Sequence, residues 1–117
     1  MNLDDASKLL LNIVGMRVEL QTTKTQSYLR WLVGDAVVAW QRPLSKKDVA
    51  ATGVAGDVIA VHVADIGEKA AWMIAAPATC FDSPHFSGYP AVLINLTTAD
   101  PQVLFELADA AAERARV

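Results

Sequence analysis

The stretch SYLRWLVGDAVVAWQ, residues 27 to 41, decides the fold of this chain. Its two arms, 27–33 and 36–41, are rich in β-branched and aromatic residues, which favour a pleated strand. Between the arms stands Gly34-Asp35, a glycine-containing pair that suits a two-residue turn. The stretch therefore predicts a β-hairpin.

Apolar periodicity and capping residues predict the elements on either side of this hairpin. Helices are expected over 3–14, from Ser45 to Gly53, from Asp65 to Pro77 and from Asp100 onward, and strands over 57–64 and 91–96. Residues 80–90 are expected to form a loop or an irregular edge strand, because prolines, serines and a glycine interrupt them. A hairpin combined with separate helices predicts an α+β fold of two layers, in which helices cover one face of an antiparallel sheet.

The composition is that of one ordinary globular domain, residues 1–117, because 53% of the residues are hydrophobic and 20% are charged. A single cysteine excludes an internal disulfide. No apolar run approaches the roughly 20 residues that cross a bilayer. The first residues lack the basic segment and cleavage site of a secretory signal. We therefore expect a cytoplasmic protein with no membrane partner.

Charge is unevenly distributed along the chain. Residues 17–47 hold six basic and two acidic residues, whereas residues 48–117 hold three basic and nine acidic ones. Clustered Lys and Arg side chains bind phosphates by releasing counterions, which makes the six candidates for nucleic-acid binding. They are Arg17, Lys24, Arg30, Arg42, Lys46 and Lys47. The alternative is a solvated surface over which strand alternation scatters them, and a net charge of −3 favours that alternative.

The sequence offers no catalytic residues, metal site or cofactor motif. Glycine-rich phosphate loops, the hydrolase elbow and the zincin helix are all missing from it. Cys80, Asp82 and His85 lie within six residues and, together with His62, are the candidates for zinc ligands or for a Cys–His nucleophile, but their spacing is typical of neither. We therefore expect a protein that is not an enzyme, with Cys80 packed as a small apolar residue and His62 as a structural histidine.

Tryptophan occurs on both hairpin arms, as Trp31 and Trp40, and on the third predicted helix, as Trp72. Packing in the core or on the sheet is the expected role of all three. An alternative makes Trp31, Tyr28 and Arg30 an exposed surface for stacking and phosphate contact. Strand alternation opposes this alternative, because it places Tyr28 and Arg30 on one face and Trp31 on the other.

The segment from Phe81 to Pro90 carries several aromatic rings in an irregular loop. Exposed rings are costly, so the loop either folds back as a lid on the core or forms a contact surface. Its prolines make it rigid and lower the entropy cost of binding. The candidate interaction residues are Phe81, His85, Phe86 and Tyr89.

Three segments resemble the MmcQ/YjbR-like family in its actinobacterial-style branch. They are WQRPLSKKD at 40–48, VHVADIGEK at 61–69 and FDSPHFSGYPAVLINL at 81–96. The likeness spans about residues 28 to 116, and PHFSGYPAVL is its most specific part. Gln41, Ser87 and Asn95 stand where the family usually has Glu, Asp and Arg. The resemblance implies a CyaY-like α+β domain, a DNA-binding label and no enzymatic activity.

Two classes of function follow from these observations. The first is a DNA-binding or regulatory module that uses the six basic residues, as the family label suggests. The second is a non-catalytic module that binds a protein or a small ligand through the loop at 81–90. Neither class requires a cofactor.

Overall fold

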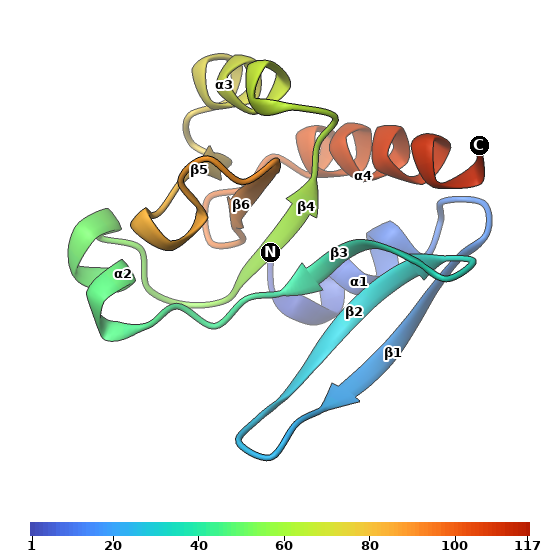
Figure 1. The fold of residues 1–117 in the computed structure, drawn as a ribbon, viewed down its shortest axis with the longest axis horizontal. Helices are drawn as coiled ribbons and strands as arrows, with labels where there is room; N and C mark the ends of the chain where they lie inside the picture. Colours follow the sequence, from blue (N-terminus) through green and yellow to red (C-terminus); the bar gives the residue numbers. More distant parts are fainter.

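The computed structural model describes all of residues 1–117, and a six-stranded antiparallel sheet with strand order β1-β2-β3-β4-β6-β5 forms its centre (Figure 1). The strands are β1 (Met16–Thr22), β2 (Ser27–Val33), β3 (Ala36–Gln41), β4 (Val58–His62), β5 (Cys80–Phe81) and β6 (Ala91–Asn95). The helices are α1 (Leu3–Leu10), α2 (Lys46–Thr52), α3 (Ile66–Ala75) and α4 (Pro101–Arg116), with a 3-10 turn, η1 (Pro84–Phe86). The predicted α+β class with an antiparallel sheet is confirmed.

The predicted hairpin forms with the expected boundaries, and Gly34 adopts the left-handed conformation that the turn needs, at φ +60°. One feature of the hairpin was not predicted. The register between β2 and β3 shifts after Trp31, so that Trp31 faces Ala39 while Leu32 faces Val37. This bulge leaves Val38 without a partner on β2 and buries both Val38 and Ala39 in the same core.

Side-chain caps begin the helices as the sequence predicts. Ser45, Asp65 and Asp100 each accept a backbone N–H of the first turn of α2, α3 and α4. The left-handed Gly53 ends α2.

The first helix is shorter than the 3–14 predicted for it. It ends at Leu10, because the chain must turn there to enter β1. Two hydrogen bonds form that turn, from Ile13 N–H to the Leu10 carbonyl and from Met16 N–H to the Ile13 carbonyl. Ile13 is nevertheless buried.

Strand β1 was missed in the sequence. Its signal is present, because Met16, Val18 and Leu20 alternate with polar residues at 17, 19 and 21. The exposed fraction of its side chains is high, so burial does little to enforce the pattern. Pairing with β2 along the whole of 16–22 stabilises the strand instead.

Two cores lie on opposite faces of the sheet. The larger one joins α1 and α4 to the sheet, and in Figure 1 α1 lies behind β2 and β3. Trp31 is completely buried in it, and its indole N–H donates to Ser7 Oγ at 3.1 Å. The smaller core covers β4 and β6 on the other face, where Phe86 packs on Ala60 and Leu93. The same face of β1, β2 and β3 has no helix over it and stays open to solvent.

Replacing Trp31 with alanine should lower the free energy of unfolding by about 3–5 kcal/mol, since it empties a large site in the core and orphans Ser7. Urea denaturation followed by far-UV circular dichroism measures the change. Ile74→Ala is the control, because Ile74 is 82% exposed and its loss should cost less than about 0.5 kcal/mol. Equal effects of the two substitutions would contradict the burial assigned to Trp31.

Candidate binding surface on the open face

A shallow pocket of about 230 Å³ lies on the open face of the sheet. We call it the aromatic pocket, and it is lined by Tyr28, Arg30, Val37, Trp40, His62 and Tyr89. Three neighbouring strands and one loop contribute to it. Tyr28 and Arg30 are two residues apart on β2 and therefore share a face, and the register places Trp40 directly opposite Arg30. The pocket therefore exists only when the hairpin, β4 and the loop at 82–90 are assembled.

Aromatic rings form a continuous row from this pocket to the smaller core. The ring centroids of Trp40 and His62 are 4.6 Å apart, and those of His62 and Tyr89 are 6.0 Å apart. Phe86 continues the row, 5.8 Å from Tyr89 and 6.3 Å from Trp40. The Arg42 guanidinium lies 5.1 Å from the Phe86 ring centroid, a cation–π contact at the far end of the row. The row supplies flat apolar surface with a cation beyond it.

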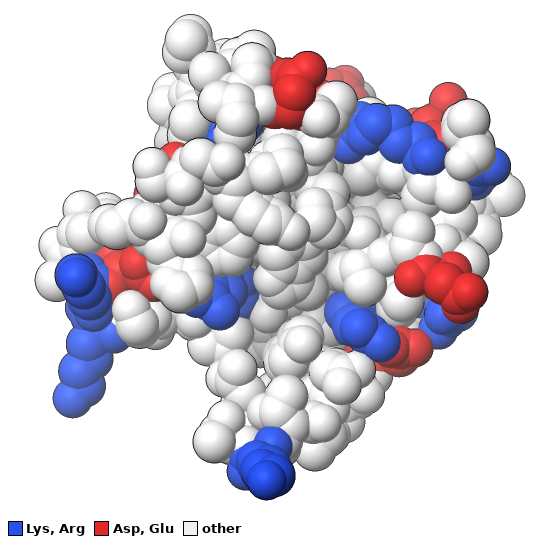
Figure 2. Space-filling view, in the orientation of Figure 1, with Lys and Arg blue, Asp and Glu red and all other residues white.

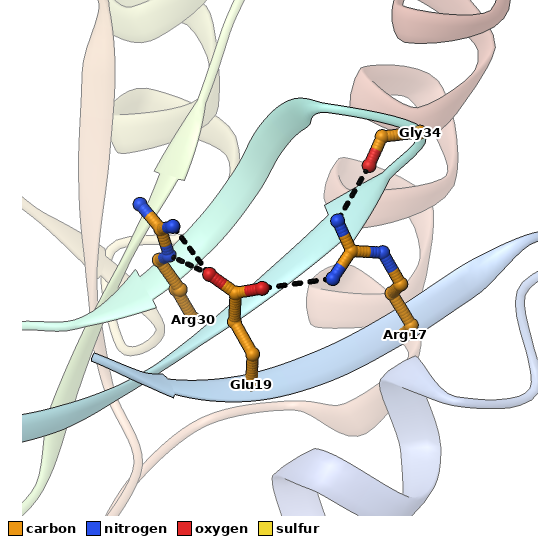
Figure 3. A network of polar contacts seen from close by, with 4 residues as sticks. All are labelled: Arg17, Glu19, Arg30 and Gly34. Carbon is orange, nitrogen blue, oxygen red and sulfur yellow. Dashed lines mark hydrogen bonds and ion pairs between the residues drawn. The ribbon is translucent and has the colours of Figure 1, made fainter.

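A carboxylate holds the arginine at the pocket (Figure 3). Glu19 accepts from Nε of Arg30 at 2.6 Å and from Nη1 of Arg17 at 2.8 Å, and Arg17 also donates to the Gly34 carbonyl at 2.9 Å. The Arg17 and Arg30 guanidinium groups hold the pKa of Glu19 below its usual value. Two cations share one carboxylate, so this network carries a net positive charge. Nη1 of Arg30 has no acceptor within the protein and remains free to donate.

His62 contributes a neutral ring to the pocket. Burial lowers the pKa of His62 below its ordinary value, the Pro90 carbonyl opposes this effect, and the Arg114 charge adds to it. The imidazole is therefore uncharged at neutral pH. Its unprotonated nitrogen can accept a hydrogen bond.

A buried lysine ties the loop at 82–90 to the rest of the molecule. Lys69 on α3 is 2% exposed, and its Nζ donates to the carbonyls of Phe86 at 2.7 Å and Tyr89 at 2.9 Å. The same group pairs with Asp82 at 2.9 Å. One ammonium group thus holds the loop at three points and satisfies its own three donors. It thereby sets where Phe86 and Tyr89 lie.

The aromatic residues of the loop differ in their exposure to solvent. Phe86 is 7% exposed and, with the half-buried Phe81, forms a lid over the smaller core. Tyr89 is 40% exposed and lines the aromatic pocket. His85 is exposed and lines a separate polar depression that also contains Lys47. The four predicted residues of the loop therefore divide between core and surface.

The six predicted nucleic-acid-binding residues lie in different parts of the fold. Arg17 and Arg30 are brought together on β1 and β2, but Glu19 lies between them. Lys24 belongs to the turn between these strands, Arg42 follows β3, and Lys46 and Lys47 open α2. Figure 2 shows the basic groups of this face as separate patches with uncharged or acidic atoms between them.

The alternative of an exposed stacking surface that includes Trp31 is wrong, because Trp31 is buried in the larger core. The prediction from strand alternation is confirmed, since Tyr28 and Arg30 lie on the opposite face of the sheet. Trp40 and His62 were not assigned to a site from the sequence. Only strand register shows that they meet Arg30, and register depends on pairings that a single sequence does not display.

The residues with possible metal or nucleophile chemistry remain separate. Nowhere do three His, Cys, Asp or Glu side chains gather as a metal ion would require. Burial raises the pKa of the Cys80 thiol to about 11, so the thiol is protonated at neutral pH. Cys80 packs in the helix-side core, as the sequence predicts.

Replacing Lys69 with methionine should lower the free energy of unfolding by about 2 kcal/mol, because two loop carbonyls and Asp82 lose their shared donor. It should also speed hydrogen exchange of the amides at 82–90. Lys47→Met is the control, since Lys47 is exposed and forms no ion pair. Unchanged exchange in the loop of the Lys69 variant would show that other contacts hold it.

Stability should fall as the pH drops from 7 to 5.5, partly because of His62. The folded chain holds the His62 pKa below about 6.5, so the unfolded chain takes up the proton first and gains stability as the pH falls. His62→Gln should reduce the drop in thermal midpoint across this window. The same loss of midpoint in the variant and the parent chain would contradict this. His85→Gln, at an exposed site, is the matched control.

No helix of the structure has the length and apolar character needed to span a bilayer. No known protein-family model matches the chain. It is 40% identical over 94 residues to the uncharacterized protein Rv2570 of Mycobacterium tuberculosis and to the uncharacterized protein Mb2600 of Mycobacterium bovis. Each alignment covers 75% of this chain and 73% of the relative. The chain therefore belongs to the same family as these mycobacterial proteins.

Proposed function

We propose that this protein is a non-catalytic binding module whose site is the aromatic pocket. The observation that supports this proposal most strongly is the meeting of four rings with a free N–H of Arg30 on the open face of the sheet. The rings favour a flat apolar group, and the arginine favours a negative charge next to it. The proposed ligand is therefore a planar ring that carries a carboxylate or a phosphate.

The size of the pocket indicates that this ring is part of a larger partner. Sites that enclose a whole drug-sized ligand have volumes of about 300–1,000 Å³. The aromatic pocket measures about 230 Å³ and is open on one side, so it suits one ring. A larger cavity of about 320 Å³ between α2 and β4 contains Arg42, but no group of aromatic and charged side chains converges there.

DNA or RNA is a second candidate source of such a ring. Proteins that bind single strands stack bases on exposed aromatic side chains beside a basic groove, and the aromatic pocket has the first of these features. A continuous basic groove, the second feature, is not formed, because the basic residues are separated and the Glu19 carboxylate neutralises part of their charge. The resemblance to the MmcQ/YjbR-like family, which we propose as the wider family of this chain, adds the DNA-binding label. It rests mainly on the segment PHFSGYPAVL.

Phenyl phosphate is a suitable probe of the ligand chemistry, since it joins a ring to an anion. Titration should shift the indole ¹H–¹⁵N signal of Trp40, while the signals of Trp31 and Trp72, which do not line the pocket, should stay in place. Inorganic phosphate and cyclohexanol should each bind more weakly. Equal shifts of all three indoles, or no shift at all, would contradict the proposed site.

Arg30→Gln should weaken phenyl phosphate binding about tenfold, because a charge-assisted hydrogen bond is lost. Arg17→Gln is the matched control. Arg17 binds the same carboxylate but does not line the pocket, so its loss should leave the affinity within about twofold. Comparable losses in both variants would indicate a general charge effect.

A fluorescein-labelled ten-residue oligothymidine tests the nucleic-acid candidate. Its anisotropy should rise with micromolar protein at about 50 mM salt and fall steeply by 200 mM. Tyr89→Ala and Trp40→Ala should each abolish the rise. If the oligonucleotide does not bind at the lower salt concentration, single-stranded DNA is excluded as the ligand. The proposal that the pocket binds a ring carrying an anion is then tested by the phenyl phosphate titration alone.

A further inference from the structure

Strand β1 forms an open edge of the sheet. It pairs only with β2, and Figure 1 shows no element along its other side. The backbone bonds at its ends tell which groups face outward. Thr23 N–H bonds across the turn to the Gln26 carbonyl, whereas Met16 N–H bonds away from β2 to Ile13. Because antiparallel pairing alternates, the N–H and C=O groups of Val18 and Leu20 point to the open side.

This edge lacks the protection that exposed edges usually carry. Natural proteins block such strands with unpaired charges, above all lysine, with proline, with bulges or with a covering element. The two charged residues of β1, Arg17 and Glu19, form an ion pair with each other. Residues 16–22 contain no proline or lysine and pair with β2 in an unbroken register. The side chains of Val18 and Leu20 are 37% and 63% exposed. A seven-residue strand is thus left ready to pair with another strand.

The sequence of the edge is complementary to itself. In Met16-Arg-Val-Glu-Leu20, a two-fold axis at Val18 places Arg17 opposite Glu19 of a second copy, and Met16 opposite Leu20. Each charged residue therefore lies opposite a residue of the other charge, and each apolar residue lies opposite another apolar residue. An axis one residue later or earlier would place Glu19 against Glu19 or Arg17 against Arg17. Charge complementarity favours the axis at Val18.

We propose that the protein forms a dimer in which β1 pairs antiparallel with β1 of a second copy, centred on Val18. The two Val18 residues exchange N–H to C=O bonds, and each Leu20 N–H donates to the Met16 carbonyl of the other chain. The two sheets then join into one. A two-fold axis normal to the sheet keeps equivalent faces on the same side, so both aromatic pockets open in the same direction. The paired area is small, so the dimer is expected to dissociate in the micromolar range.

Sedimentation velocity on the full chain, from about 5 to 500 µM, spans this range. The weight-average mass should rise from 12.5 kDa toward twice that value. Val18→Pro should keep the chain monomeric, because it removes an outward N–H and no bond to β2. Thr22→Pro is the matched control, since it removes an outward N–H beyond the paired segment and should dimerise like the parent. A parent chain that stays monomeric, or a Val18→Pro variant that dimerises normally, overturns the proposal.

Two cysteine variants test the register and do not depend on tolerance of proline. In an antiparallel hydrogen-bonded pair the Cα atoms are about 5.5 Å apart, within disulfide range. Val18→Cys should therefore form an interchain disulfide under mild oxidation, seen on a non-reducing gel. Leu20→Cys should not, because the two residues at position 20 are offset by four residues, about 13 Å. The native Cys80 is buried and does not interfere. Cross-linking through position 20 alone, or equally through both positions, overturns the axis at Val18.

Discussion

The buried ammonium group of Lys69 is the interaction on which the loop at 82–90 and the shape of the aromatic pocket depend. Strands β4 and β6 are apolar on both sides, so a second layer must cover the side that the helices leave bare. The loop at 82–90 is that layer, and it is too irregular to support itself by backbone pairing. Lys69 supplies the missing donors from within α3 and places Phe86 against β4 and β6. One side chain thus joins the packing of the smaller core to the position of Tyr89.

This division of the sheet explains why aromatic and charged groups meet where they do. The covered half ends at Trp40 and His62, and the uncovered half begins at Arg30 and Tyr28. The boundary exposes ring edges that would otherwise be buried, beside an arginine that Glu19 holds in place. A binding site at such a boundary gains apolar contact from one half and charge from the other. The proposed pairing of β1 would not obstruct it, because β1 contributes no lining residue to the pocket.

The basic residues of this region show that closeness in the sequence does not predict a shared surface. The basic residues of 17–47 look like a patch when they are counted along the chain. In space, alternation and register separate these residues, and Glu19 on β1 neutralises part of the charge of Arg17 and Arg30. Counting charges along a sequence measures composition, whereas binding depends on the field at one surface.

The sequence by itself determined the α+β class, the hairpin at 27–41 and the starts of the three later helices, because each depends on interactions among residues close in the chain. It also determined that Trp31 and Arg30 lie on opposite faces, since strands alternate. Only the tertiary structure decided the end of α1, the pairing of β1, the bulge beside Trp31 and the meeting of Arg30, Trp40, His62 and Tyr89. These depend on register and on contacts such as the one from Lys69 to the loop, which link residues far apart in sequence and leave no local pattern.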